Sequence, residues 1–296
     1  MPFNNWLKNL GVNSKDLYKE SLDPLTQTTA NTAGESVTFK LPLDQLLYGI
    51  SIATTKDTDG SLGDFIKEIE FKLDGARVVR NLSGGMIKAI NYLDHRKTST
   101  GYYFLKIADD VLGTDPIPLN QFTSASLKVT VTAAGSGVKA VVTPTLQLGK
   151  RSSYPRLSNI GQGRVLVETF LPMEQYGTAT GDLKYDHMRG QGIVGYVLET
   201  GDNGTLSDTT FSTYTLQLIG KDERLTPQNK VALKVIKEEN TQDANGNALP
   251  TGYFYIDFPD SLRTSEFTTV RSLFTATVAG TQKQVRVLER YILGGQ

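Results

Sequence analysis

The chain has 296 residues, enough for two domains of ordinary size that each bury a core. Its 31 basic and 31 acidic side chains cancel, so no net field attracts nucleic acid, and direct nucleic-acid binding is disfavoured. The absence of Cys excludes disulfide scaffolds, thiolate zinc sites and Cys nucleophiles. The sequence shows neither a secretory signal nor a run of about 20 apolar residues, so we expect a soluble chain made in the cytoplasm.

Residues 3–22 carry the most helical pattern in the chain. Apolar residues recur there at steps of three and four, which predicts a short amphipathic helix that ends before Pro24. The apolar residues are Phe3, Trp6, Leu7, Leu10, Leu17 and Leu22. Such a short helix is marginal in water, so we expect it to dock on a surface, and three alternatives stay open: its own barrel, a neighbouring subunit or lipid. With the polar residues 26–35 as a linker, residues 1–35 are predicted to form an arm outside the folded domains.

Residues 36–150 contain many short apolar runs separated by Gly, Asn, Asp and Pro, with one short helix expected at residues 86–93. Residues 151–163 are basic, Pro-bearing and flanked by Gly, which is typical of an interdomain linker. Residues 164–296 then repeat the strand-rich pattern. Short strands in such numbers favour a sandwich or jelly roll in each half. We therefore predict an all-β protein of two consecutive jelly-roll β-barrels, residues 36–150 and 164–296, behind a short N-terminal helical arm.

Segments of the first half return in the second half in the same order. The clearest pair is GYYFLKIADDVL from Gly101 and GYFYIDFPDSL from Gly252, each a Gly followed by an aromatic and β-branched run. Three further pairs are 41–45 with 171–175, 70–75 with 215–220, and 126–135 with 272–280. This spacing is far longer than the period of about 20 to 50 residues found in solenoids, so it indicates a duplicated domain. We predict that paired segments are equivalent strands, and that the Leu41 and Leu171 strands each open one copy.

A group of acidic residues after residue 56 has the oxygen spacing of a calcium loop. Its members are Asp57, Asp59, Asp64 and Glu68. Carboxylates at alternating positions supply the oxygen ligands that calcium takes. However, Leu62 stands where an EF-hand loop needs Gly, and the flanking segment is strand-like. Two alternatives therefore stay open, a structural calcium site and an ordinary acidic hairpin.

Residues suited to catalysis do not form a coherent set. The motif at residues 190–195 matches GxGxxG, but an alternating strand pattern follows it where a dinucleotide site needs a helix N-terminus. His95 and His187 each follow an Asp, yet they lie in different halves and neither has a Ser nucleophile placed for it. We therefore expect no enzyme, no catalytic residues and no cofactor apart from calcium at the acidic group.

Short segments in both halves carry a family resemblance. They are SVTFKLP at residues 36–42, IKEIEFKLDG at 66–75, the basic turn His95-Arg96-Lys97, YIDF at 255–258 and VRVL at 285–288. Together they resemble the double jelly-roll major capsid proteins of tailless icosahedral phages with an internal membrane, closest to the corticovirus type. The resemblance covers nearly the whole chain, with longer loops in the second half. It implies two jelly rolls side by side, pseudo-hexagonal homotrimers, and an N-terminal arm near neighbouring subunits or the membrane.

The resemblance implies a major capsid protein of the virion shell, synthesised in the host cytoplasm. Its expected partners are further copies of itself, other capsid or membrane-associated virion proteins, and the surface of the internal membrane. A cysteine-free, duplicated β-sandwich with zero net charge agrees with a subunit that assembles through many weak contacts. The alternative from another class is a carbohydrate-binding or adhesive tandem β-sandwich with aromatic platforms at Tyr92, Tyr154 and Tyr185. An enzyme on a jelly-roll scaffold ranks third, and the size of the protein in solution discriminates among these readings.

Overall fold

A computed structural model describes most of the chain. The described residues are 17–93, 98–108, 114–149, 165–170, 174–176, 182–186, 192–202, 205–219, 228–229, 250–263, 268–276 and 283–293. The chain divides into two compact units, which we call unit 1 (Met1–Lys88, Thr98–Val167 and Leu293–Gln296) and unit 2 (Ala89–Lys97 and Glu168–Ile292). Within the described residues, no helix is long and apolar enough to span a membrane.

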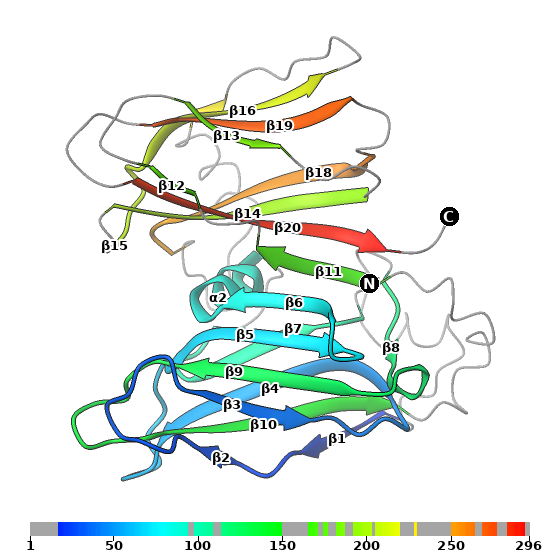
Figure 1. Ribbon diagram of the computed structural model, residues 1–296, viewed down its shortest axis with the longest axis vertical. Coiled ribbons are helices and arrows are strands. Elements are labelled where there is room, and N and C mark those ends of the chain that lie inside the picture. The colour runs from blue at the N-terminus through cyan, green and yellow to red at the C-terminus, as the bar shows by residue number, and fades with distance from the viewer. Residues whose placement is uncertain are drawn as a thin grey trace. The chain divides into compact units, whose positions relative to one another are not determined.

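Unit 1 contains two antiparallel sheets (Figure 1). The first has the order β1 (Leu17–Ser21), β10 (Ala140–Gly149), β4 (Leu46–Lys56), β7 (Tyr102–Lys106), with β2 (Leu25–Thr26) beside β10 and β8 (Ile117–Pro118) beside β4. The second has the order β3 (Ser36–Lys40), β9 (Ala125–Val131), β5 (Ile66–Leu73), β6 (Arg77–Ser83). Helix α2 (Gly84–Leu93) follows β6 and confirms the predicted short helix, while a 3-10 turn, η2 (Leu119–Gln121), precedes β9.

Unit 2 repeats this arrangement. Its first sheet has the order β11 (Val165–Phe170), β20 (Lys283–Leu293), β14 (Gly192–Asp202), β18 (Tyr253–Arg263), with β12 (Glu174–Tyr176) beside β20 and β15 (Thr205–Leu206) beside β14. Its second sheet has the order β13 (Asp182–Asp186), β19 (Thr269–Ala276), β16 (Phe211–Ile219), β17 (Gln228–Asn229). The division between the units falls inside α2 and inside β11, so β11 belongs to unit 2 from Glu168 onward.

The two units share one topology. The main strands in chain order are β1, β3, β4, β5, β6, β7, β9 and β10 in unit 1, and β11, β13, β14, β16, β17, β18, β19 and β20 in unit 2. In both units one sheet joins the first, eighth, third and sixth of these strands, and the other joins the second, seventh, fourth and fifth. This interleaved order defines a jelly roll. The predicted fold class, two consecutive jelly rolls, is therefore confirmed.

Alternating burial produces these strands. In β10, every second residue from Ala140 to Leu148 is buried and the residues between are partly exposed, the pattern of a strand with one face on a core. The core of unit 1 includes Ile50, Phe71 and Leu127, and none of these side chains is exposed. In unit 2, the rings of Phe211 and Phe254 meet edge to face with centroids 4.9 Å apart. Burying each such side chain contributes about 1.5 to 3 kcal/mol, which holds the sheets together.

The topology decides which repeated segments are equivalent. Three of the predicted pairs are right: β7 with β18, β5 with β16, and β9 with β19 occupy matching places. The pair at Leu41 and Leu171 is wrong, because β3 lies at an edge beside β9 whereas β11 lies beside β20. Both strands contain an apolar alternation and are followed by Leu-Pro in the sequence, but this pattern does not determine the position of a strand in its sheet. The counterpart of β11 is β1.

The helical prediction is wrong for Leu17–Ser21, which forms β1. This strand pairs antiparallel with β10, with Leu17 opposite Gly149 and Ser21 opposite Thr145. The hydrogen bonds between β1 and β10 therefore decide the conformation of this segment, because an apolar pattern this short cannot stabilise a helix by itself. Leu22 continues the pairing, since its N–H donates to Pro144 O at 3.0 Å. Phe3, Trp6, Leu7 and Leu10 lie outside the described residues, and the arm that begins there leads into the first strand of jelly roll 1.

Residues 26–35 do not form the polar linker that the sequence predicts. Gln27 is buried, its N–H donates to Ala140 O at 2.9 Å, and its Oε1 accepts from the N–H of Ala140 at 3.2 Å. Asn31 adopts a φ of 64° and its Oδ1 accepts the N–H of Gly137 at 2.8 Å. The Glu35 carboxylate accepts the N–H groups of Thr28 and Thr29. In this segment polar side chains accept the backbone N–H groups that a neighbouring strand would otherwise bind. The segment is therefore an ordered loop, although it contains few apolar residues.

Candidate functional site

The repeated Gly marks a corner where the strand β7 begins in unit 1. Gly101 has a φ of 72°, and its N–H donates to Asp64 Oδ1 at 2.7 Å. Its carbonyl accepts the N–H of Thr54 at 2.8 Å. The Thr54 side chain is fully buried and its Oγ1 donates to Gly63 O at 2.6 Å. These bonds tie the end of β4, the loop that follows it and the start of β7 into one corner.

Unit 2 repeats the corner atom for atom at the start of β18. Gly252 has a φ of 83°, and its N–H donates to Asp208 Oδ1 at 2.6 Å. Its carbonyl accepts the N–H of Thr200 at 2.8 Å, and Thr200 Oγ1 donates to Ser207 O at 2.7 Å. Thr200 therefore corresponds to Thr54 and Asp208 to Asp64. The sequence repeat led to the two glycines. The two Asp residues close similar tetrapeptides, SLGD at residues 61–64 and TLSD at residues 205–208, a signal that sequence reasoning missed.

Glycine is required at both corners. A Cβ on Gly101 would lie 2.8 Å from Thr54 O, and a Cβ on Gly252 would lie 2.9 Å from Thr200 O. These contacts are with backbone atoms, which cannot move aside, and the positive φ angles add strain for any other residue. The corner therefore explains why each copy of the repeat begins with Gly.

Asp64 connects the first corner to helix α2. Its Oδ2 lies 2.5 Å from Lys88 Nζ, which sits over the Tyr103 ring at 5.2 Å from the centroid. Tyr103 also donates its hydroxyl to Asp64 Oδ1 at 3.4 Å. Burial, and then the Asp64 charge, raise the pKa of Tyr103. Burial is the largest influence on Asp64 and opposes its charge, but the Gly101 N–H and Lys88 outweigh it and hold the pKa of Asp64 below its ordinary value.

The lowered pKa of Asp64 predicts a pH dependence. A depressed carboxylate pKa stabilises the fold fully above the ordinary Asp pKa of about 4, and this contribution is lost as the pH falls through the folded-state pKa. In Asp64→Asn we expect lower stability at pH 7 and a shallower loss of stability below about pH 4 than in the unchanged protein. Urea unfolding at several pH values measures both. Parallel pH profiles for the two proteins would contradict the assignment.

The four carboxylates of the calcium hypothesis make separate contacts. Asp57 Oδ1 accepts the N–H of Lys139 at 2.9 Å, and Asp59 Oδ1 accepts the N–H of Ser61 at 2.8 Å. Asp64 belongs to the corner, and Glu68 lies on β5 opposite Ser83. In the part of the chain that the structure describes, no three His, Asp or Glu side chains are arranged to hold a metal ion.

Calcium at these residues stays a prediction with a direct test. If Asp57 and Asp59 bind the ion with backbone oxygens of their hairpin, millimolar calcium should raise the melting temperature by mass action. The double variant Asp57→Asn/Asp59→Asn should lose this shift, and Glu70→Gln on the outer side of β5 should keep it. Absence of binding heat in calorimetry, together with unchanged melting in chelator, would remove the ion from the account.

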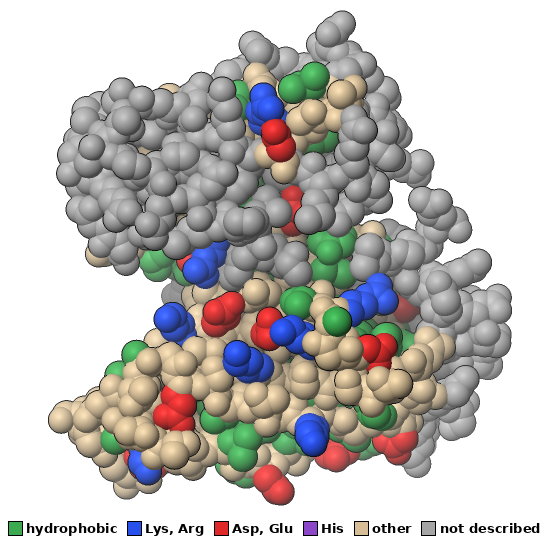
Figure 2. All heavy atoms as spheres, in the orientation of Figure 1, with side chains coloured by type: hydrophobic (Ala, Val, Ile, Leu, Met, Phe, Trp, Pro, Cys, Tyr) green, Lys and Arg blue, Asp and Glu red, His purple; other side chains and the backbone are tan. Residues whose placement is uncertain are grey.

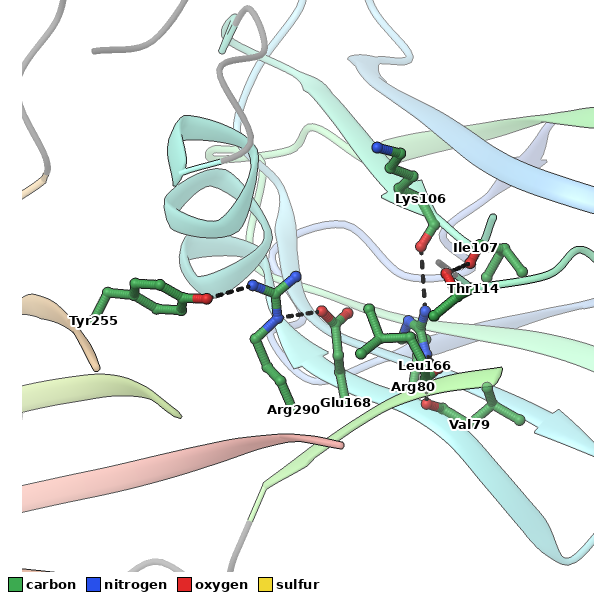
Figure 3. A network of polar contacts seen from close by, with 9 residues as sticks. All are labelled: Val79, Arg80, Lys106, Ile107, Thr114, Leu166, Glu168, Tyr255 and Arg290. Carbon is green, nitrogen blue, oxygen red and sulfur yellow. Dashed lines mark hydrogen bonds and ion pairs between the residues drawn. The ribbon is translucent and has the colours of Figure 1, made fainter. Parts of the chain in front are cut away.

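Unit 2 buries an ion pair with a tyrosine (Figure 3). Arg290 Nε lies 2.9 Å from Glu168 Oε1, and both side chains are about 95% buried. Arg290 Nη1 donates to the Tyr255 hydroxyl at 3.1 Å, and its guanidinium carbon lies 5.8 Å from the centre of that ring. Charge-assisted bonds of this kind are strong in a low dielectric, and breaking one costs more than the pair contributes.

Unit 1 contains a fully buried arginine, Arg80 on β6. Its Nη1 donates to the carbonyls of Val79 and Leu166, and its Nη2 donates to Lys106 O at 3.2 Å (Figure 3). Sequence reasoning missed Arg80 and Arg290. For Arg80 the available signal was a cation in phase with the buried Leu82 in RVVRNLS. Arg290 is out of phase with the core residues Val285 and Val287, so strand alternation gives no such signal for it. Both groups connect residues of different strands.

The structure describes one of the three aromatic side chains of the adhesive alternative. Tyr92 lies near the end of α2 with only 1% of its surface exposed, so the prediction of a sugar-stacking platform is wrong for this residue. Helical spacing buries it together with Met86 and Ala89. Tyr154 lies outside the described residues, as does the side chain of Tyr185. His95 and His187 also lie outside them.

Comparison with solved structures finds this fold in viral coat proteins. The MCP of STIV, Sulfolobus turreted icosahedral virus, matches with a TM-score of 0.70 and 14% identity over 94% of this chain and 96% of that chain. The major capsid protein P2 of bacteriophage PM2 matches with a TM-score of 0.66 and 15% identity over 93% and 97%. The Faustovirus major capsid protein matches with a TM-score of 0.56 and 7% identity over 94% and 90%.

Neither a family model nor a curated protein sequence matches the chain. The similarity is therefore one of fold, and it spans nearly the full length of both partners in each comparison. The chain has the double jelly-roll fold of viral major capsid proteins, and the resemblance drawn from its sequence is confirmed at this level.

Proposed function

We propose that the chain is a major capsid protein that forms pseudo-hexagonal homotrimers and assembles into an icosahedral phage shell over an internal membrane. One observation carries the proposal: the same jelly roll occurs twice in one chain, and viral major capsid proteins share this arrangement over 93% to 94% of it. A protein with two equivalent units can place six units around a ring with three chains. The described polar networks bind strands to one another, which suits a structural subunit without enzymatic activity or cofactor.

The proposed partners are other copies of the chain, further capsid or membrane-associated virion proteins, and the membrane surface beneath the shell. The protein would be made in the host cytoplasm and reside in the virion. Light scattering of the purified full-length protein tests the central claim, with a stable trimer expected and particles visible by electron microscopy under assembly conditions. A monodisperse monomer at every concentration would contradict the proposal.

The arm gives a second test, and β1 sharpens it. Deleting residues 1–16 leaves β1 intact, so we expect trimers with nearly unchanged melting that fail to form particles. Deleting residues 1–25 also removes the strand that pairs with β10 from Leu17 to Ser21, so we expect a lower melting temperature. Calorimetry and electron microscopy measure the two effects. Normal particles from the shorter deletion would contradict a role for Phe3, Trp6, Leu7 and Leu10 in assembly.

A further inference from the structure

The first sheet of unit 1 has one side on the core and one side away from it. Cross-strand partners share a side, so the register gives the rows of outward residues. The rows are Val141, Thr55 and Leu62; Thr143, Ala53 and Tyr102; Ser21, Thr145, Ser51 and Phe104; and Lys19, Gln147, Gly49 and Lys106. We call these residues the outer face of unit 1.

This outer face differs from the outward side of the second sheet of unit 1. In these rows the charged residues are two lysines in one end row, and the other rows are uncharged. Two large apolar side chains are exposed on it, Tyr102 at 51% and Leu62 at 41%. The second sheet instead carries both signs on its outward side, as in the 2.7 Å pair of Lys72 with Glu70, and Figure 2 shows blue and red side chains interspersed over unit 1. Few charges and exposed aromatics are typical of the centre of a protein interface.

The corner bonds align this face with its counterpart in unit 2. Because Thr54 corresponds to Thr200, Ser51 corresponds to Val197, and the matching strand partners of Val197 are Leu288 and Tyr255. The aromatic residue also lies over a glycine in both units. A Cβ on Gly49 would meet the Phe104 ring at 2.9 Å, and a Cβ on Gly195 would meet the Tyr255 ring at 3.3 Å.

The two equivalent faces differ in burial at their centre, whereas at one end Leu62 and its counterpart Leu206 are both exposed, at 41% and 45%. In unit 2, Val197 and Leu288 have no exposed surface and Tyr255 has 8%. Their counterparts in unit 1, which are Ser51, Thr145 and Phe104, are all partly exposed. Duplication has therefore preserved the geometry of a face whose centre is buried in one unit and uncovered in the other.

We infer that the outer face of unit 1 is an interface, and that its occupant is a second copy of this chain. The inference rests on the proposed function. A duplicated subunit that closes a ring with its own copies gives equivalent surfaces equivalent surroundings, so the face that is buried in unit 2 becomes buried in unit 1 when copies associate.

The size of the face agrees with this occupant. Strands β4 and β10 have 11 and 10 residues, and β1 and β7 have 5 each. At about 3.3 Å per residue and about 4.8 Å between strands, the four strands give about 500 Å² of flat area. One side of a standard interface buries about 800 Å², including the relief of its side chains. The outer face is therefore large enough to be the main part of one contact.

A charge placed in the centre of the face tests the inference. In full-length protein, Thr145→Arg should convert the trimer into monomer, because association would bury an unpaired cation away from water. The melting temperature of the monomer should show that the chain is still folded. The matched control is Thr38→Arg, an exposed position on β3 in the other sheet, which should remain trimeric. A folded Thr145→Arg variant that remains trimeric would overturn the assigned face while the proposed function stands. A monomeric unchanged protein would overturn the proposed function and the interface together.

The absence of Cys in the chain permits a second readout that needs no disruptive charge. Ser51→Cys is nearly isosteric and places one thiol in the middle of the face. We expect maleimide to label it at least tenfold more slowly in the trimer than in the Thr145→Arg background, while Thr38→Cys labels equally in both. Equal labelling of the Ser51→Cys thiol in the trimer and in the folded Thr145→Arg monomer would overturn the inference. If the charged variant does not fold, a Ser51→Cys thiol that labels in the trimer as fast as the Thr38→Cys thiol would overturn it.

Discussion

Replacing Gly101 by Ala should lower the free energy of unfolding by about 3 kcal/mol, among the largest effects of any small substitution in unit 1. Two costs add at this position. The positive φ of 72° strains a residue with a Cβ, and that Cβ would lie 2.8 Å from Thr54 O, a backbone atom bound into the corner. Relief requires the end of β4 to move, which breaks the bond from Thr54. Urea unfolding of the purified variant measures the loss.

A second glycine separates the two costs. Gly60 has a φ of 68°, and a Cβ there would have no atom within 4 Å. Gly60→Ala should therefore lose about 1 kcal/mol, from backbone strain alone. Gly252→Ala, at the matching corner of unit 2, should behave as Gly101→Ala does. Equal losses at Gly60 and Gly101 would show that crowding against Thr54 contributes nothing and that the corner is not a packed element.

The corners show how far sequence reasoning reaches. Gly101 and Gly252 stand at the head of similar aromatic runs, so the repeat and the fold class could be predicted from local pattern. Asp64 and Asp208 close similar tetrapeptides, SLGD and TLSD, but so short a pattern does not show that each carboxylate binds a Gly 37 or 44 residues further along the chain. Their role depends on which segments distant in the sequence come into contact. The alternation of apolar and polar residues predicts which side chains are buried, but it does not predict such contacts.

The same reason explains the error at the N-terminus. Leu17 has the spacing of a helix, and only the presence of Gly149 on a neighbouring strand makes it part of β1. Without β1, the sequence offers β3 as the first strand of unit 1, and the equivalence of β3 with β11 follows from that mistake. One tertiary pairing therefore shifts both the domain boundary and the alignment of the repeat.

The buried pair of Glu168 and Arg290 should show the second large effect. Arg290→Met keeps most of the side-chain volume but leaves the Glu168 carboxylate, with 5% of its side chain exposed, without its guanidinium partner. Breaking such a buried pair costs about 3 to 5 kcal/mol, because the charge left behind has little access to water. We expect a corresponding fall in the urea midpoint of unit 2. Tyr255 also loses its contact with Arg290, which adds to the loss.

A double variant and an exposed pair decide whether burial is the cause. Removing both charges, in Arg290→Met with Glu168→Leu, should recover most of the lost stability, because an apolar pair of similar volume carries no desolvation cost. The exposed pair of Arg271 with Asp186 has comparable geometry, 2.5 Å from Nε to Oδ1, but 57% of the Asp186 side chain is exposed. Arg271→Met should therefore leave the urea midpoint nearly unchanged. If Arg290→Met and Arg271→Met had equal effects, burial could not be the source of the loss. Failure of the double variant to recover would instead show that Arg290 acts through Tyr255 and the packing of its own side chain, a role in which the charge of Glu168 has no part.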